Sequence, residues 1–445
     1  MTDIFHRQNN TELPVAVSGE GIYLTDADGK RYLDACGGAA VSCLGHSDPD
    51  IVAAIQEQAG KLSYAHTSFF TSDPSEELAS LLINDAPDEF GKVYFVSGGS
   101  EAVETALKLA KQFFYETGDR ERTMFIGRRQ SYHGNTIGAL SLGENAARRE
   151  AFSEMLMDCG RVSPCNEYRG RRDEEDEEDY ADRLAVELEQ EINRLGANRV
   201  AAFVAETVGG ATPGVTPPVK GYFKRVREIC DRYGILLILD EVMCGAGRTG
   251  TFFAFEQDDI VPDLICIAKG LGGGYMPIGA TLVSKRIFAA FDKGKGNFIN
   301  GHTYLGHPIA CAASLAVQKK IRQNNLLENV RRQGVNLISK LTERFGNHPH
   351  VGNIRGRGLF VGVELVADRA SKEAFDPALK LHALIKSEAM KCGLMCYPAG
   401  GSVDGIRGDH ILLAPPFIIT ESELDELVDK LGQAVDAALV QTTQL

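Results

Sequence analysis

The strongest constraint on the fold is an alternation of short apolar runs with longer amphipathic stretches between residues 92 and 284. Short apolar runs bounded by glycine, proline or acidic residues are typical of buried strands, and the amphipathic stretches are typical of helices. This alternation predicts an α/β fold with a largely parallel sheet and helices on its faces. Polar groups that follow such strands gather at one edge of the sheet, where ligands bind. The expected strands cover residues 92–96, 123–127, 200–206, 235–241, 264–269 and 279–284.

One of these strands leads directly to a lysine. The stretch LICIAKGLGGGYMPIG, residues 264–279, places Lys269 before a glycine-rich turn, where the backbone can pass close to a ligand. Lysine becomes a nucleophile when desolvation or a neighbouring cation lowers its pKa, and it then forms Schiff bases with aldehydes such as pyridoxal phosphate. Taken alone, Lys269 is more simply a solvated loop cation. The covalent role requires a phosphate cradle, a pyridinium partner and a stacking ring elsewhere in the chain.

A carboxylate follows the preceding strand. Asp240 comes after the apolar run ILLIL, and a buried carboxylate is costly unless a cation meets it. A protonated pyridine nitrogen is such a cation, and its protonation strengthens the ring as an electron sink. Asp240 lies 29 residues before Lys269, a separation that suits one crossover between successive strands. No histidine is spaced with Asp240, Glu241 or Glu206 as a ligand set, so no metal site is expected.

Two further segments are candidates for the cradle and the ring. Residues 97–100, Ser-Gly-Gly-Ser, connect a strand-like run to a strong helical pattern, and free amides at a helix N-terminus bind phosphate. The simpler interpretation is a βα turn with Ser100 as the helix cap. Tyr132, in the segment SYHG, could stack on a planar cofactor or pack as an ordinary aromatic at a strand end.

Composition restricts the class of protein. The chain has 445 residues, of which 44% are hydrophobic and 24% charged, as in ordinary globular proteins. Its net charge of −14 argues against nucleic-acid binding. The ten cysteines include no Cys-x-x-Cys pair and indicate a reducing compartment. No apolar run approaches the roughly 18 residues of a membrane span, and the N-terminus has no signal-peptide pattern. We therefore expect a cytoplasmic protein without membrane or nucleic-acid partners.

Taken together, the motifs resemble those of one family. The segments SGGSEAVETALKLA, SYHG, AETVGG, LDEVMCGAGRTG, AKGLGGGYMPIGA and GHTYLGHP occur in this order. The chain resembles the class III aminotransferases, pyridoxal-phosphate enzymes of fold type I, from GIYLTDADGKRYLDA near the N-terminus to APPF near the C-terminus. The resemblance implies a large domain with a seven-stranded, mostly parallel sheet and a smaller α+β domain from the two termini. The expected boundaries are 1–60 for the N-terminal segment of the small domain, 61–318 for the large domain and 319–445 for the C-terminal part.

The resemblance also implies roles for individual residues. Lys269 is expected to bind pyridoxal 5'-phosphate covalently and to act with Asp240 in catalysis. Thr303, in GHTY, matches a phosphate-binding threonine that reaches the neighbouring subunit's site, which implies a homodimer or a dimer of dimers. The full set of implied cofactor contacts is Gly99, Ser100, Tyr132, Glu206, Asp240, Val242, Lys269 and Thr303.

The substrate side is less defined. Tyr64, Phe70 and Arg407 are the candidates for contacts with substrate. Arginine binds carboxylates in bidentate geometry, but Arg407 is offset from the family pattern, and a surface charge is the alternative. In place of Glu-Pro followed by Val-Gln-Gly, the chain has ETVGG after Ala205 and so lacks the glutamine of many relatives.

The expected activity is transfer of an amino group from an amine or ω-amino acid to a keto acid such as pyruvate or 2-oxoglutarate, by a ping-pong mechanism through Lys269. The alternatives are a racemase, aminomutase or dialkylglycine-type decarboxylase on the same scaffold, or a non-catalytic pyridoxal-phosphate-binding protein. The acidic run at residues 173–179 is expected to be a solvated loop, because such runs repel themselves.

Overall fold

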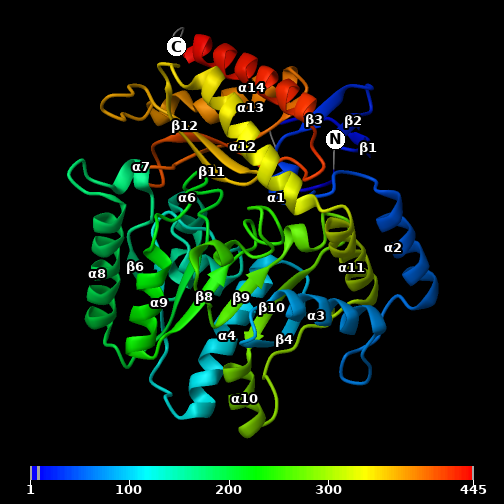
Figure 1. Cartoon of the computed structure of the whole chain (residues 1–445), viewed down its shortest axis with the longest axis vertical. Helices are drawn as coiled ribbons and strands as arrows, with labels where there is room; N and C mark the ends of the chain where they lie inside the picture. The colour runs from blue at the N-terminus through cyan, green and yellow to red at the C-terminus, as the bar shows by residue number, and fades with distance from the viewer. Residues whose placement is uncertain (1–2, 8–10, 443–445) are drawn as a thin grey trace.

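The computed structural model describes residues 3–7 and 11–442, and a seven-stranded sheet lies at its centre (Figure 1). The strand order is β4-β10-β9-β8-β7-β5-β6. All neighbouring pairs are parallel except those of β10, which is antiparallel to both β4 and β9. The predicted α/β fold with a mostly parallel sheet is confirmed. The strands are β4 (Phe90–Val96), β5 (Met124–Arg128), β6 (Gly160–Val162), β7 (Val200–Glu206), β8 (Leu236–Asp240), β9 (Leu264–Ile267) and β10 (Gly279–Ser284).

Both faces of this sheet are apolar, which is why its strands read as nearly continuous apolar runs. Alternate residues of β8 belong to different hydrophobic clusters: Leu237 and Leu239 pack on one face, and Leu236 and Ile238 on the other. Helices α3, α8 and α9 contribute to the first cluster, and α4 and α10 to the second. The helices around the sheet are α3 (Asp73–Asp85), α4 (Gly99–Thr117), α5 (Ile137–Leu142), α8 (Glu177–Leu195), α9 (Tyr222–Tyr233), α10 (Lys285–Lys293) and α11 (Pro308–Gln323).

The register of the central strands aligns their carboxyl ends. Glu206, the last residue of β7, is paired with Asp240, the last residue of β8. Asp240 is in turn paired with Cys266 of β9, and Lys269 follows two residues after the end of that strand. Three neighbouring strands therefore deliver two acids and one lysine to the same edge of the sheet.

The C-terminal third of the chain forms an antiparallel sheet packed against three long helices, at the top of Figure 1. The strand order of this sheet is β11-β12-β15-β14. A separate hydrophobic cluster, distinct from the two on the central sheet, joins these strands to the helices. The elements are α12 (Leu326–Phe345), β11 (Val351–Arg357), β12 (Phe360–Leu365), α13 (Leu381–Lys391), β14 (Tyr397–Gly400), β15 (Asp409–Leu413) and α14 (Glu421–Thr442).

The N-terminal strands complete this upper part. A second four-stranded sheet has the order β1-β2-β3-β13. Its first three strands are antiparallel and come from the N-terminal segment: β1 (Ala16–Glu20), β2 (Tyr23–Asp26) and β3 (Arg31–Asp34). The last strand, β13 (Leu394–Met395), comes from the C-terminal third and pairs in parallel with β3. The N-terminal segment thus packs with the C-terminal third. The domain boundaries at residues 60 and 318 stay a prediction.

Other helices make up most of the remaining regular structure. They are α1 (Gly37–Ala40), α2 (Pro49–Lys61), α6 (Ala146–Arg149) and α7 (Glu167–Gly170), with 3-10 helices η1 (Glu150–Met155), η2 (Ala254–Asp258), η3 (Lys269–Leu271) and η4 (Pro377–Leu379). Among the described residues, no helix is long and apolar enough to cross a membrane.

The acidic run at residues 173–179 is not wholly a loop, and that expectation was wrong for its second half. Asp176 caps α8, and residues 177–179 form the first turn of this helix. Carboxylates are favourable there because they face the positive end of the helix dipole. Glu175 is also held by Arg183, at 2.5 Å, so the charges of the run are partly compensated within the fold.

Candidate active site

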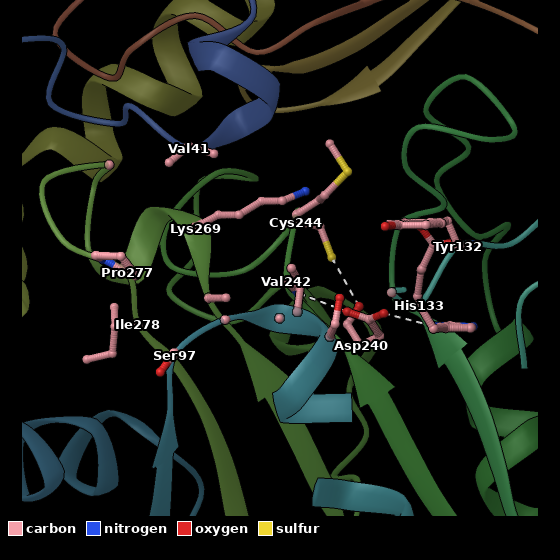
Figure 2. A pocket seen from close by; sticks show the side chains of 18 of the residues that line it. Val41, Ser97, Tyr132, His133, Asp240, Val242, Cys244, Lys269, Pro277 and Ile278 are labelled. Atoms are coloured by element: carbon pink, nitrogen blue, oxygen red, sulfur yellow. Dashed lines mark hydrogen bonds and ion pairs between the residues drawn. The ribbon is translucent and has the colours of Figure 1, made fainter. Parts of the chain in front are cut away.

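A cavity of about 380 Å³ lies at the carboxyl edge of the central sheet (Figure 2). Most of the residues that the resemblance assigned to the cofactor line this one cavity, although they come from five separate segments of the chain. They are Gly99, Ser100, Tyr132, Glu206, Asp240, Val242 and Lys269.

Lys269 is the only lysine or arginine among the described residues that line this cavity. Its backbone is in the left-handed region, with φ of 45°, a conformation that is uncommon outside glycine and frequent at functional sites. Burial among apolar groups lowers the pKa of the Lys269 amine to about 8, against the opposing effect of Asp240 and Glu206. A substantial fraction of the amine is therefore neutral near pH 8, as a nucleophile requires.

Asp240 is buried and held by two hydrogen bonds. His133 Nδ1 lies 2.7 Å from Asp240 Oδ2, and the Val242 amide donates to Oδ1 at 3.0 Å. Figure 2 shows His133 beside Asp240, with Lys269 extending across the cavity above them. Because an ionised carboxylate only accepts hydrogen bonds, His133 carries its proton on Nδ1 in this contact. The opposite nitrogen, His133 Nε2, is buried without a hydrogen-bond partner among the described residues.

Glu206 is the second acid of the cavity. The Gly210 amide donates to one carboxylate oxygen at 2.9 Å, and the Tyr132 amide to the other at 3.4 Å. Burial raises the pKa of the Glu206 carboxyl above its ordinary value. Through these two bonds Glu206 connects the loop after β7 to the segment that carries Tyr132, so it has a structural function in addition to its place in the cavity.

The turn between β4 and α4 has the geometry expected of an anion cradle. Gly98, with φ of −175°, is the N-cap of α4, so the alternative with Ser100 as the cap was wrong. The helix has 19 residues, and its first amides have no intrahelical acceptor. A Cβ on Gly99 would lie 2.6 Å from Val242 Cγ1. Only glycine therefore allows the backbone of the cradle to lie this close to Val242.

The remaining predicted residues lie outside this cavity in the single chain. Thr303, Tyr64 and Phe70 are exposed, and the Tyr64 hydroxyl donates to the Thr303 carbonyl at 3.0 Å. The Arg407 guanidinium is bound to Asp404, with Nε and Oδ2 2.7 Å apart. Their functional roles stay predictions.

Several residues of the site were not predicted from the sequence. His133 is the most important, because it is the side-chain partner of Asp240. It stands beside Tyr132 in SYHG, but a local motif does not reveal which strand end its side chain faces. Other lining residues are small or apolar and carry no distinctive pattern: Val41, Val208, Met243, Cys244, Met276 and Ile278.

The fold is that of fold type I transaminases. A crystal structure of an omega transaminase from Pseudomonas jessenii, in complex with PMP, superposes with a TM-score of 0.92 and 34% sequence identity, over 99% of this chain and 97% of that chain. An (S)-enantioselective omega-transaminase from Thermomicrobium roseum gives a TM-score of 0.91 and 35% identity, over 98% and 96% of the two chains.

The chain belongs to the class III aminotransferases. The profile described as aminotransferase class-III matches residues 4–435. An uncharacterized aminotransferase from Schizosaccharomyces pombe is 47% identical over 437 residues, which cover 98% of this chain and 95% of the relative. A probable gamma-aminobutyrate transaminase 3 from Oryza sativa subsp. indica is 36% identical over 96% of this chain and 82% of the relative. The predicted family and enzyme class are confirmed.

Proposed function

We propose that this aminotransferase binds pyridoxal 5'-phosphate through Lys269. It moves an amino group from an amine or ω-amino acid to a keto acid such as pyruvate or 2-oxoglutarate, by a ping-pong mechanism. The observation that carries this proposal is the pairing of a lysine whose pKa is lowered to about 8 with a buried aspartate in one cavity. The names of the relatives, which include gamma-aminobutyrate and omega transaminases, support the same donor class.

The residues of the cavity fit the cofactor at three points. The N-terminus of α4 is a site for the dianionic phosphate, because its amides and helix dipole both favour an anion. Asp240 is buried, and no lysine or arginine of the described residues forms an ion pair with it, so it can accept the pyridinium N–H. The Lys269 amine faces the same cavity and can reach an aldehyde carbon there.

When bound, pyridoxal phosphate supplies an electron sink for the bond that breaks at the substrate carbon. Asp240, oriented by His133, would hold the pyridine nitrogen in its protonated form. Gly99 and Ser100 would hold the phosphate, while Tyr132 and Val242 would contact the two faces of the ring. Glu206 would keep Tyr132 in place through its contact with the Tyr132 amide.

Lys269 would also move the proton. With a substrate amine bound, the Lys269 amine would be the base that takes and holds the proton of the substrate carbon. Its lowered pKa favours the neutral base in which this transfer begins. The carbonyl product leaves before the keto acid enters, which gives ping-pong kinetics.

We also propose a homodimer or dimer of dimers in which Thr303 binds the phosphate at the neighbouring subunit's site. The exposed position of Thr303 and the exposed aromatic rings of Phe69, Phe70 and Tyr304 support an interface at this surface.

The proposed location of the protein is the cytoplasm. Its ten cysteines are all free thiols, which supports a reducing environment.

A panel of amines, tested against pyruvate and 2-oxoglutarate, examines the proposed reaction. We expect stoichiometric alanine or glutamate with at least one amine donor, and no turnover by Lys269→Ala. Production of carbon dioxide or of a racemised or isomerised amine without amino transfer would instead point to the alternative reactions. Substantial turnover by Lys269→Ala would exclude the assigned role of the lysine.

A further inference from the structure

Arg148 lies close to the cavity but has no role in the site as described so far. It belongs to the short helix α6, whose turn is fixed by the Asn145 side chain, which accepts from the Arg148 amide at 3.2 Å. The guanidinium carbon of Arg148 is 4.4 Å from the centre of the Tyr132 ring, a cation–π stacking distance. Tyr132 itself lines the cavity, and Figure 2 shows it at the cavity's edge. A permanent cation is thus separated from the cavity by one aromatic ring.

The Arg148 side chain is exposed, and in residues 3–7 and 11–442 no carboxylate forms an ion pair with its guanidinium. The next residue, Arg149, behaves differently, because its Nη1 donates to three main-chain carbonyls, Leu140, Ser141 and Gly143. Arg149 therefore anchors the segment, whereas the donors of Arg148 are available to a ligand.

The other candidate for carboxylate binding, Arg407, is already engaged. Its Nε donates to Asp404 Oδ2 at 2.7 Å, and the Asp404 carboxylate also accepts from the Arg407 amide. A substrate carboxylate at Arg407 would therefore lie beside the negative charge of Asp404, whereas no ion-paired carboxylate lies beside Arg148 among the described residues.

We propose that Arg148 is a specificity-determining residue that binds the carboxylate of donors whose amine and carboxylate are several carbons apart. This inference rests on the proposed function. The reacting carbon must lie beside Lys269 inside the cavity, whereas Arg148 stacks on the Tyr132 ring and does not itself line the cavity. An α-carboxylate is attached to the reacting carbon and is too short to leave the cavity, while the carboxylate of an ω-amino acid can extend past the ring. Arginine matches this ligand because its planar guanidinium donates two parallel hydrogen bonds to a carboxylate.

A second effect of Arg148 reaches the reacting centre. Its positive charge lowers the pKa of Lys269, although burial has the larger effect. A carboxylate bound to Arg148 would neutralise this charge. Occupation of the proposed subsite is therefore coupled electrostatically to Lys269.

The test compares matched donors on the holoenzyme. The donors are 6-aminohexanoate and hexylamine, which differ only by the terminal carboxylate, and the variants are Arg148→Gln, Arg148→Lys and the control Arg407→Gln. We expect Arg148→Gln to raise KM for 6-aminohexanoate about tenfold to hundredfold, the range for loss of a hydrogen-bonded charge pair. The KM for hexylamine should change less than about twofold, because this donor has no carboxylate that could lose a charged hydrogen bond. Arg148→Lys should restore part of the loss, because it keeps the charge without the bidentate geometry.

A binding readout separates recognition from turnover. Calorimetric titration of the holoenzyme with hexanoate, which has the carboxylate but no amine, should show weaker binding in Arg148→Gln and unchanged binding in Arg407→Gln. The inference is overturned if Arg148→Gln affects both donors equally, or if only Arg407→Gln weakens hexanoate. Failure of the proposed function would look different, because the wild-type protein would then transfer an amino group from neither donor.

Discussion

The buried lysine should make the cofactor-free protein less stable than it would be with a neutral side chain. The pKa of Lys269 falls from 10.5 in an unfolded chain to about 8 in the fold. Between these values the unfolded state binds the proton and the folded state does not, so stability increases with pH across this window. At about 1.4 kcal/mol for each pKa unit, the protonated lysine costs about 3 kcal/mol at pH 7.

We therefore expect Lys269→Met to stabilise the cofactor-free protein at neutral pH. For a chain of 445 residues, with an unfolding entropy of about 2 cal/mol/K per residue, about 3 kcal/mol corresponds to a rise in Tm of about 3 °C. At pH 9.5 the lysine is mostly neutral in the fold, and the gain in Tm should fall to about 1.5 °C.

Differential scanning calorimetry at fixed protein concentration measures both values. Lys224→Met is the matched control, because Lys224 is an exposed lysine on α9 and its replacement removes no buried amine. A Tm for Lys269→Met equal to or below that of the wild type at pH 7 would refute the reasoning.

Substitutions at three further positions examine the cavity. Asp240→Asn removes the carboxylate that favours the protonated amine, so the pKa of Lys269 should drop below about 8. The pH dependence of trinitrobenzenesulfonate labelling at Lys269 measures this pKa. A rise in the pKa of Lys269 would contradict the assigned electrostatics. His133→Ala should reduce kcat about tenfold to hundredfold, because Asp240 loses a hydrogen bond of 2.7 Å. His133→Asn should recover part of the lost kcat. An unchanged kcat in His133→Ala would mean that the contact has no role in turnover. Gly99→Ala places a Cβ 2.6 Å from Val242 Cγ1, and titration with pyridoxal phosphate should show about tenfold weaker binding, whereas an unaltered Kd would argue against the cradle.

The central sheet could be predicted because its strands are buried on both faces. Runs such as ILLILD and LICIA contain almost no polar residue, and each corresponds to a strand of the structure. The order of the strands and the direction of β10 could not be predicted in this way. They depend on pairing between segments far apart in the chain, such as Gly279 with Val96, and no local pattern encodes that pairing.

The site was predictable where a polar residue follows an apolar strand directly. Asp240 and Lys269 meet this condition, and the register of β7, β8 and β9 brings their strand ends together. His133 lies five residues beyond the end of β5, and only the folded loop turns its ring toward Asp240. Arg148 was missed for a similar reason, since its contact with Tyr132 depends on the turn of α6.

The central claim is that Lys269 is the covalent attachment site of the cofactor. The most direct test is borohydride reduction of the protein loaded with pyridoxal phosphate, followed by proteolysis and mass spectrometry of the peptides. We predict one phosphopyridoxyl group per chain, located on Lys269. A label on a different lysine, or a cofactor that dissociates after reduction, would contradict the claim.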